Sequence, residues 1–139
     1  TEENWKKRIT SSNDKINPKQ KDFSDWVQKT TKEMHEYGIK FMAGTDTPLG
    51  FLIPGFSLHV ELELLVESGL SELDAIKTAT INPSKYFKMH DYLGLIKKNY
   101  IADLVLLNSN PLDDIKNTRQ ISAVIKNGMI YENPLIIKR

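Results

Sequence analysis

The sequence IKFMAGTD, from Ile39 to Asp46, is a short apolar run that ends in a carboxylate. We expect it to form a β-strand with Asp46 at its C-terminal tip, followed by a loop that starts at Thr47. Barrel enzymes present metal ligands and other reactive groups from that end of a strand. Asp is also common where turns begin, so the alternative is that Asp46 only caps the following turn. The stretch by itself leaves both roles open.

The residues before this stretch have the pattern of an amphipathic helix. Asn17-Pro18 is typical of an N-cap followed by proline in the first turn, and Gly38 stands where a left-handed C-terminal cap belongs. We expect one apolar stripe of this helix to pack in the core. Residues 1–16 are polar and lack a sustained period, so we expect a linker or a helix end there. The stripe consists of Phe23, Trp26, Val27, Thr30, Met34 and Tyr37.

Two further helices are predicted after Asp46. The loop 47–57 combines Pro and Gly with apolar residues, which suggests a segment packed over a cleft or against another part of the molecule. The next helix ends near Gly69. Ser71 begins a further helix with a capping-box-like sequence, and Asn82-Pro83 is expected to end or interrupt that helix. The loop's apolar residues are Leu49, Phe51, Leu52, Ile53 and Phe56; the first helix has Leu58, Leu62, Leu65 and Val66 on its apolar side and Glu61, Glu63 and Glu67 on its expected solvated side.

The last third of the chain has the pattern of short strands. Apolar runs at 93–96 and 104–107 are predicted strands, and segments 121–126 and 129–131 flank Asn127-Gly128. Asn-Gly between two such segments is the strongest two-residue hairpin signal. The predicted order is therefore helix, strand, two helices and a small β unit, which is an α/β fold.

The composition excludes several classes of protein. The 139 residues carry 19 basic and 18 acidic side chains, without the clustered basic face that nucleic-acid binding needs. There is no cysteine, so disulfides and thiolate metal sites are ruled out. No apolar run approaches the roughly 18 residues of a membrane span. We expect a soluble protein with neither nucleic acid nor membrane as partner; its compartment stays open, since a signal peptide could precede Thr1.

An ordered set of short motifs resembles the C-terminal part of the metal-dependent amidohydrolase superfamily, most closely its imidazolonepropionase-like branch. The resemblance covers about residues 39 to 131. Asn99 stands where relatives usually have glycine, and Asn tolerates a left-handed backbone better than most residues. The motifs are GTD (44–46), LHVELELL (58–65), SGLS (68–71), AIKTATINP (75–83), LGLI (93–96), ADLVLL (102–107), NPL (110–112) and VIKNG (124–128).

The resemblance implies a (β/α)8 TIM barrel that carries a small β-sandwich. Residues 17–90 would supply the last barrel strand and its flanking helices, and residues 91–139 would supply a portion of the sandwich. Asp46 matches the acid after the eighth strand, which in the family binds a divalent metal and handles the proton of the attacking water. The implied cofactor is zinc or another divalent metal, with one or two ions in the complete enzyme. The family's other ligands, a His-x-His pair among them, are not in this sequence.

The implied reaction is hydrolysis of a C–N bond in a cyclic amide, a dipeptide or a related small molecule. Asp46 is thus the candidate catalytic residue and the candidate metal ligand. His59 opens a helix with Glu63 one turn later and is a candidate substrate-binding residue, with a structural role as the favoured alternative. Asp103 and Asn110-Pro111 are expected to shape turns away from the chemistry.

By itself the chain is expected to be catalytically silent, because one carboxylate cannot replace a cage of three or four ligands. Its expected partners are a small-molecule substrate and the missing N-terminal barrel portion, and an open barrel edge favours homo-oligomers. Three alternatives stay open: a fragment of an ordinary enzyme, one subunit of a split enzyme, or a non-catalytic binding or scaffold module.

Overall fold

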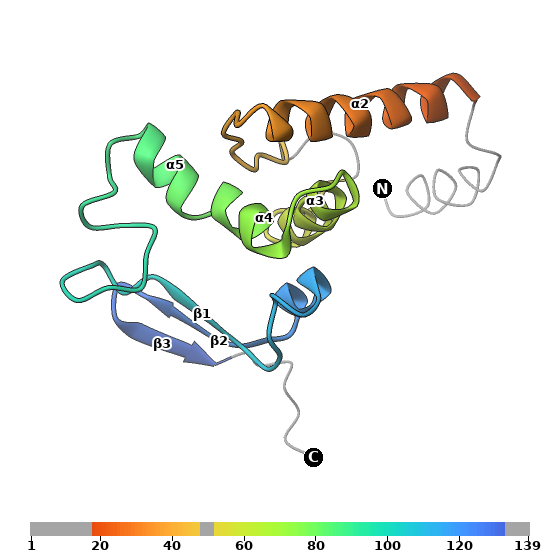
Figure 1. Cartoon of the computed structure of the whole chain (residues 1–139). Coiled ribbons are helices and arrows are strands. Elements are labelled where there is room, and N and C mark those ends of the chain that lie inside the picture. Colours follow the sequence, from red (N-terminus) through yellow and green to blue (C-terminus); the bar gives the residue numbers. More distant parts are fainter. Residues whose placement is uncertain (1–17, 48–51, 133–139) are drawn as a thin grey trace, which may run out of the picture.

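The computed structural model describes residues 18–47 and 52–132, which form a helical part followed by a small sheet (Figure 1). The three strands make one antiparallel sheet in the order β1-β2-β3, and the sheet lies below the helices in Figure 1. The elements are α2 (Pro18–Glu36), α3 (Phe56–Glu67), α4 (Glu72–Thr78), α5 (Ile81–Tyr86), β1 (Leu104–Leu107), the 3-10 helix η1 (Ile115–Arg119), β2 (Ile121–Lys126) and β3 (Met129–Glu132).

Helix α2 has the predicted extent, but its apolar stripe does not lie in a core. The helix ends at Glu36, and Gly38 follows with φ of 80°, as a left-handed cap requires. Phe23 and Trp26 stack on each other with ring centroids 5.9 Å apart, yet they are 65% and 60% exposed. The expectation of core packing is therefore wrong for the described chain. An apolar stripe is buried only where another element covers it, and none of the α2 residues is buried.

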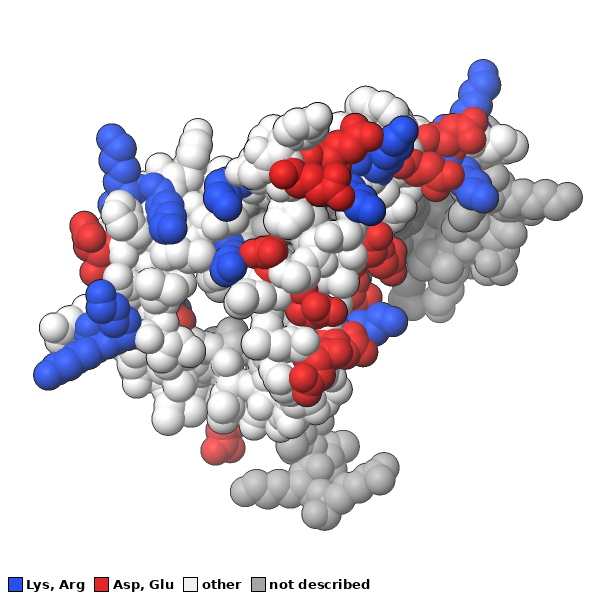
Figure 2. All heavy atoms as spheres, in the orientation of Figure 1, with Lys and Arg blue, Asp and Glu red and all other residues white. Residues whose placement is uncertain are grey.

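The polar side of α2 carries charges of both signs, which lie interspersed on the face shown in Figure 2. Lys29 pairs with Glu33 and Lys32 pairs with Glu36, each at 3.9 Å and one helical turn apart. Exposed pairs at this spacing contribute only about 0.3–0.5 kcal/mol each. Local propensity and such pairs therefore support α2 more than tertiary packing does.

Residues 39–46 do not form the predicted strand. The segment has no regular secondary structure, and no strand pairs with it within the described ranges. The physical reason is that a strand exists only through hydrogen bonds to a neighbouring strand. The prediction is therefore wrong for this structure, although the segment connects α2 to the loop before α3 as expected.

Helices α3 and α4 follow the predicted signals, whereas Asn82-Pro83 does not. Gly69 ends α3 with φ of 100°, and the Ser71 hydroxyl accepts the Asp74 amide hydrogen at 3.1 Å to cap α4. The expectation that Asn82-Pro83 ends or interrupts that helix is wrong, because α4 already ends at Thr78 and the pair lies in the first turn of α5. Proline fits there because its missing N–H would have no helical partner.

The predicted hairpin is confirmed, and one predicted strand is not. Asn127 and Gly128 have φ of 50° and 80°, both positive as a type I′ turn requires, and they join β2 to β3. Residues 93–96 are not a strand. The Ser84 hydroxyl donates to the Leu93 carbonyl at 2.7 Å, and Gly94 has φ of 92°. A left-handed residue and a carbonyl bonded to a helix are incompatible with a straight strand.

The core is small and lies where α3, α4 and η1 meet. Leu62, Ala75 and Ile115 are at most 5% exposed, and partly buried Ala43 packs against them. Ala43 belongs to the segment 39–46, so this core also supports the residues that lead to Asp46.

In the described part of the chain, no helix is long and apolar enough to cross a membrane.

Candidate active site

Asp46 lies at the end of the irregular segment 39–46, with an exposed side chain and φ of 52°. Asp is among the few residues besides glycine that adopt a left-handed backbone without a large steric penalty. This conformation turns the chain directly after the apolar run. The carboxylate is therefore presented on a bend whose geometry depends on how the preceding residues are held.

Each of the three helices after Asp46 contributes one hydrogen bond to this segment. The Asn82 side-chain amide on α5 donates to the Phe41 carbonyl at 2.9 Å, and the Ala43 amide donates to the carbonyl of Thr78, the last residue of α4, at 3.0 Å. The Gly44 amide donates to Glu61 Oε1 on α3 at 2.7 Å. Helices, rather than a neighbouring strand, thus hold the chain that presents Asp46.

Sequence reasoning missed these helix contacts. Glu61 and Glu63 were expected on a solvated helix side, and both expectations are wrong. Glu61 is half-buried against the Gly44 amide, while Glu63 binds the Arg119 guanidinium on η1 at 2.6 Å with only 15% of its side chain exposed. Glu67 is exposed as expected. One sequence signal was available. Glu61 and Glu63 both lie within LHVELELL (58–65), one of the motifs that resemble the family, and the acids of that motif did not follow simple helix polarity.

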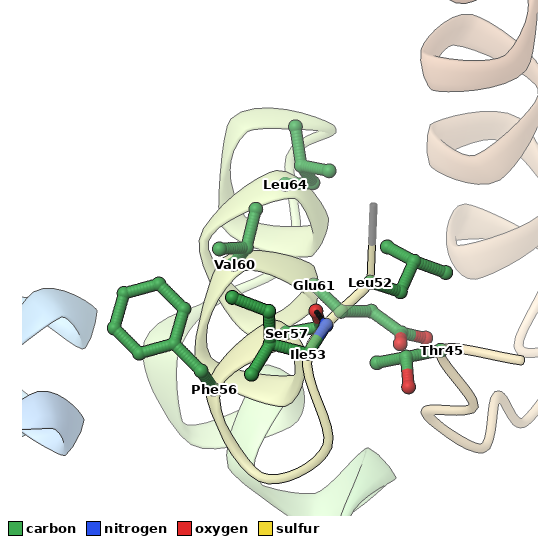
Figure 3. A pocket seen from close by; sticks show the side chains of 8 residues that line it. All are labelled: Thr45, Leu52, Ile53, Phe56, Ser57, Val60, Glu61 and Leu64. Carbon is green, nitrogen blue, oxygen red and sulfur yellow. Dashed lines mark hydrogen bonds between the residues drawn. The ribbon is translucent and has the colours of Figure 1, made fainter. Parts of the chain in front are cut away.

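A cavity of about 490 Å³ lies beside Thr45, at the base of the loop that follows Asp46 (Figure 3). Figure 3 shows the Thr45 and Glu61 side chains close together at one end of the cavity and Phe56 at the other. The predicted loop over a cleft is confirmed for Leu52, Ile53 and Phe56, while Leu49 and Phe51 lie outside the described residues. The lining consists of Thr45, Leu52, Ile53, Phe56, Ser57, Val60, Glu61 and Leu64.

His59 faces η1. Its Nδ1 lies 3.0 Å from the Thr118 hydroxyl oxygen, and that hydroxyl donates its hydrogen to the Ile115 carbonyl at 2.8 Å. The tautomer with the hydrogen on Nδ1 satisfies both contacts at once. Burial, followed by the positive charge of Arg119, lowers the pKa of His59 and favours the neutral ring. These contacts join α3 to η1; substrate binding by His59 stays a prediction.

Asp103 and Asn110 hold turns, as expected. The Asp103 carboxylate accepts the Asn127 amide hydrogen at 2.7 Å and pairs with the Lys126 ammonium. Asn110 Oδ1 accepts the Leu112 amide hydrogen at 3.1 Å in an Asx-type turn. Asn99 has φ of 69°, the left-handed conformation that its side chain tolerates.

The described residues do not make a complete metal site. No group of three or more His, Cys, Asp and Glu side chains within residues 18–47 and 52–132 is arranged to hold an ion. Two histidines each lie near a single acid: His35 Nε2 is 3.8 Å from Asp74 Oδ2, and His90 Nε2 is 4.0 Å from Asp91 Oδ1. Asp46 therefore offers one carboxylate donor, fewer than the three protein ligands that a catalytic zinc site uses.

Comparison with known proteins gives a consistent set of relatives. The model of the Amidohydrolase family matches residues 8–131. Ochratoxinase of Aspergillus niger is 34% identical over 102 residues, which are 70% of this chain and 20% of ochratoxinase. A putative adenine deaminase of Bacillus subtilis is 28% identical over 116 residues, which are 81% of this chain and 19% of the deaminase. This chain thus spans about a fifth of the length of these curated relatives.

Solved structures show the same relation. A Xaa-Pro dipeptidase with bound methionine is 33% identical, with a TM-score of 0.69 over 77% of this chain and 26% of the dipeptidase. The A. niger ochratoxinase structure has a TM-score of 0.67 at 28% identity and covers 92% of this chain and 30% of its own. The mixed helix-and-sheet arrangement found here is therefore similar to about a quarter of each larger structure.

Proposed function

Because the chain belongs to the amidohydrolase family, we propose that it forms the C-terminal portion of a metal-dependent hydrolase with a (β/α)8 barrel. Residues 39–46 would be the last barrel strand, which becomes regular only when neighbouring strands pair with it. The exposed apolar stripe of α2 supports this proposal, since the rest of a barrel enzyme would cover such a surface. The chain matches about a quarter of each solved relative, and this partial match supports the proposal as well.

The reaction we propose is hydrolysis of a C–N bond in a cyclic amide, a dipeptide or a related small molecule. The named relatives include a dipeptidase and a putative adenine deaminase, and both names denote cleavage of a C–N bond. The cavity beside Thr45 is lined mainly by aliphatic and aromatic side chains, which suits an apolar part of a substrate. The observation that carries the proposal is the exposed Asp46 carboxylate at the end of a segment held by α3, α4 and α5.

Asp46 has two proposed roles. It would be one ligand of a divalent metal, with the remaining ligands contributed from outside the described residues. When bound, zinc lowers the pKa of its water to about 7. The Asp46 carboxylate would accept the proton of the attacking water as a general base and then deliver it to the departing nitrogen as a general acid. The left-handed backbone at Asp46 keeps this carboxylate exposed on the bend.

The chain alone should neither bind zinc tightly nor hydrolyse amides, because a single carboxylate is too small a donor set. The test is to purify the chain, measure bound metal by mass spectrometry, and then add the upstream barrel portion and assay amide hydrolysis. We expect activity only in the completed enzyme, and its loss in Asp46→Asn. Asp22→Asn, on exposed α2, is the control that should keep activity.

Two results would contradict this function. Stoichiometric zinc in the chain alone would show a metal site that does not need the barrel. Full activity of the completed Asp46→Asn enzyme would remove the proposed proton shuttle. Failure of any barrel portion to restore hydrolysis would instead favour the alternative of a binding or scaffold module.

A further inference from the structure

We propose, building on the function proposed above, that Glu61 is a positioning residue for Asp46. Its carboxylate projects from α3 and accepts the Gly44 amide hydrogen at 2.7 Å, across 17 residues of sequence. Gly44 is only two residues before Asp46. The Glu61 carboxylate thereby fixes the start of the left-handed bend on which the Asp46 carboxylate is presented.

An anchor matters at this bend because Asp tolerates positive φ without requiring it, so the residue type alone does not select this conformation. Contacts from the surrounding structure have to hold Asp46 in it. The hydrogen bonds from α4 and α5 to the segment attach at Ala43 and Phe41, farther from Asp46 along the chain. Among these three contacts, the one from Glu61 has a charged acceptor, and charge-assisted hydrogen bonds are about twice as strong as neutral ones.

The protein encloses one oxygen of the Glu61 carboxylate. Oε1 is used by Gly44, while Oε2 is buried and has no hydrogen-bond partner within the described ranges. The bond from the Gly44 amide itself lies at the surface, so the enclosed Oε2, rather than the bond, limits the movement of the Glu61 side chain. Glu61 also lines the cavity next to Thr45, so it joins the cavity wall to the residues that present Asp46 (Figure 3).

Hydrogen exchange of the Gly44 amide, measured by NMR on the 139-residue chain, tests this role directly. Removing a hydrogen bond to a charged acceptor should speed local exchange about tenfold to a hundredfold in Glu61→Ala. Glu61→Gln keeps an oxygen that can accept, so exchange should be much closer to that of the original chain. Glu67→Ala, on the same helix but exposed, is the matched control and should leave Gly44 unchanged.

A second readout reports the backbone of Asp46. Positive φ brings the amide hydrogen close to the α-hydrogen of the same residue, which gives a strong intraresidue NOE. We expect this signal to weaken in Glu61→Ala and to persist in Glu61→Gln and Glu67→Ala. Loss of helix stability alone would instead raise exchange throughout α3 and would not separate the Gln variant from the Ala variant at Gly44 and Asp46.

The inference is overturned if Glu61→Ala changes neither Gly44 exchange nor the Asp46 NOE. Should Glu61→Ala fail to fold, a hydrogen-bond scalar coupling between the Gly44 amide and the Glu61 carboxyl carbon decides the matter in the original chain, and its absence overturns the inference. These measurements need no activity. In the completed enzyme, Glu61→Ala should lower kcat. An active Asp46→Asn enzyme would refute the proposed function, whereas an unimpaired Glu61→Ala enzyme beside an inactive Asp46→Asn enzyme would refute only the positioning role.

Discussion

Gly94→Ala should destabilise the fold strongly, because two separate costs meet at this residue. Gly94 has φ of 92°, and an added Cβ would lie 2.8 Å from Ser84 Cβ and 3.1 Å from the Thr80 carbonyl oxygen. Neither neighbour is the end of a flexible side chain. Ser84 is 3% exposed and is tied to Leu93 by its hydroxyl, so it has little freedom to retreat.

The size of the effect follows from these two costs. A left-handed backbone costs a residue with a Cβ about 1–2 kcal/mol, and overpacking a tight contact costs about 1–3 kcal/mol. We therefore expect Gly94→Ala to lower the free energy of unfolding by about 2–5 kcal/mol. Gly128→Ala is the matched control, since Gly128 has φ of 80° but nothing within 4 Å of an added Cβ. Only the first cost applies there, about 1–2 kcal/mol.

Urea unfolding followed by circular dichroism measures the difference between the two variants. If the slopes of the transitions agree, the shift in midpoint converts directly to a free-energy difference. Gly94→Ala should be less stable than Gly128→Ala by about 1–3 kcal/mol. Equal stability of the two variants would show that α5 and residue 94 separate easily, and the close approach would then not contribute to the fold.

Two further predictions concern ionisable side chains. The folded-state pKa of His59 is lowered, so protonation favours the unfolded chain. The contribution of His59 to the free energy of unfolding should be complete above the ordinary pKa of about 6.5 and be lost as pH drops through the lower pKa of the folded state. Urea unfolding at a series of pH values should show this decline, and an equal decline in His59→Gln would contradict the assignment. The pKa of Asp103 is lowered most by its hydrogen bond from Lys126 and next by the Asn127 amide. The contribution of Asp103 to the free energy of unfolding should therefore be complete above about pH 3.9 and be lost as pH falls through the lower folded pKa. Asp103→Ala should speed exchange of the Asn127 amide hydrogen, whereas Asp91→Ala should not; similar rates in both variants would argue against this contact.

Local signals predicted the parts of the fold that depend on a few neighbouring residues. Gly38 and Gly69 follow the helices they were expected to end, Ser71 caps α4, and Asn127-Gly128 forms the hairpin. In each case residues within about four positions set the backbone conformation of the cap or turn. The hairpin turn has in addition a hydrogen bond from the Asn127 amide to Asp103, across 24 residues.

The candidate site was only partly accessible to such reasoning. Asp46 was singled out from the sequence, but Glu61 was assigned to a solvated helix side, and Asn82 was considered only together with Pro83 as a helix stop. Their bonds to Gly44 and Phe41 span 17 and 41 residues. Helix periodicity shows which side a residue occupies; it does not show which distant backbone group approaches that side.

The sequence by itself determined helices α2 and α3 with their terminal glycines, the cap of α4, the hairpin of β2 and β3, the family to which the chain belongs and the position of the exposed acid Asp46. Only the tertiary structure decided that residues 39–46 are held by three helices, that the α2 stripe is exposed, and that His59 faces η1. The physical reason is that helix caps and tight turns are closed within one or two turns of backbone. Strand pairing and burial, in contrast, depend on which distant surfaces meet.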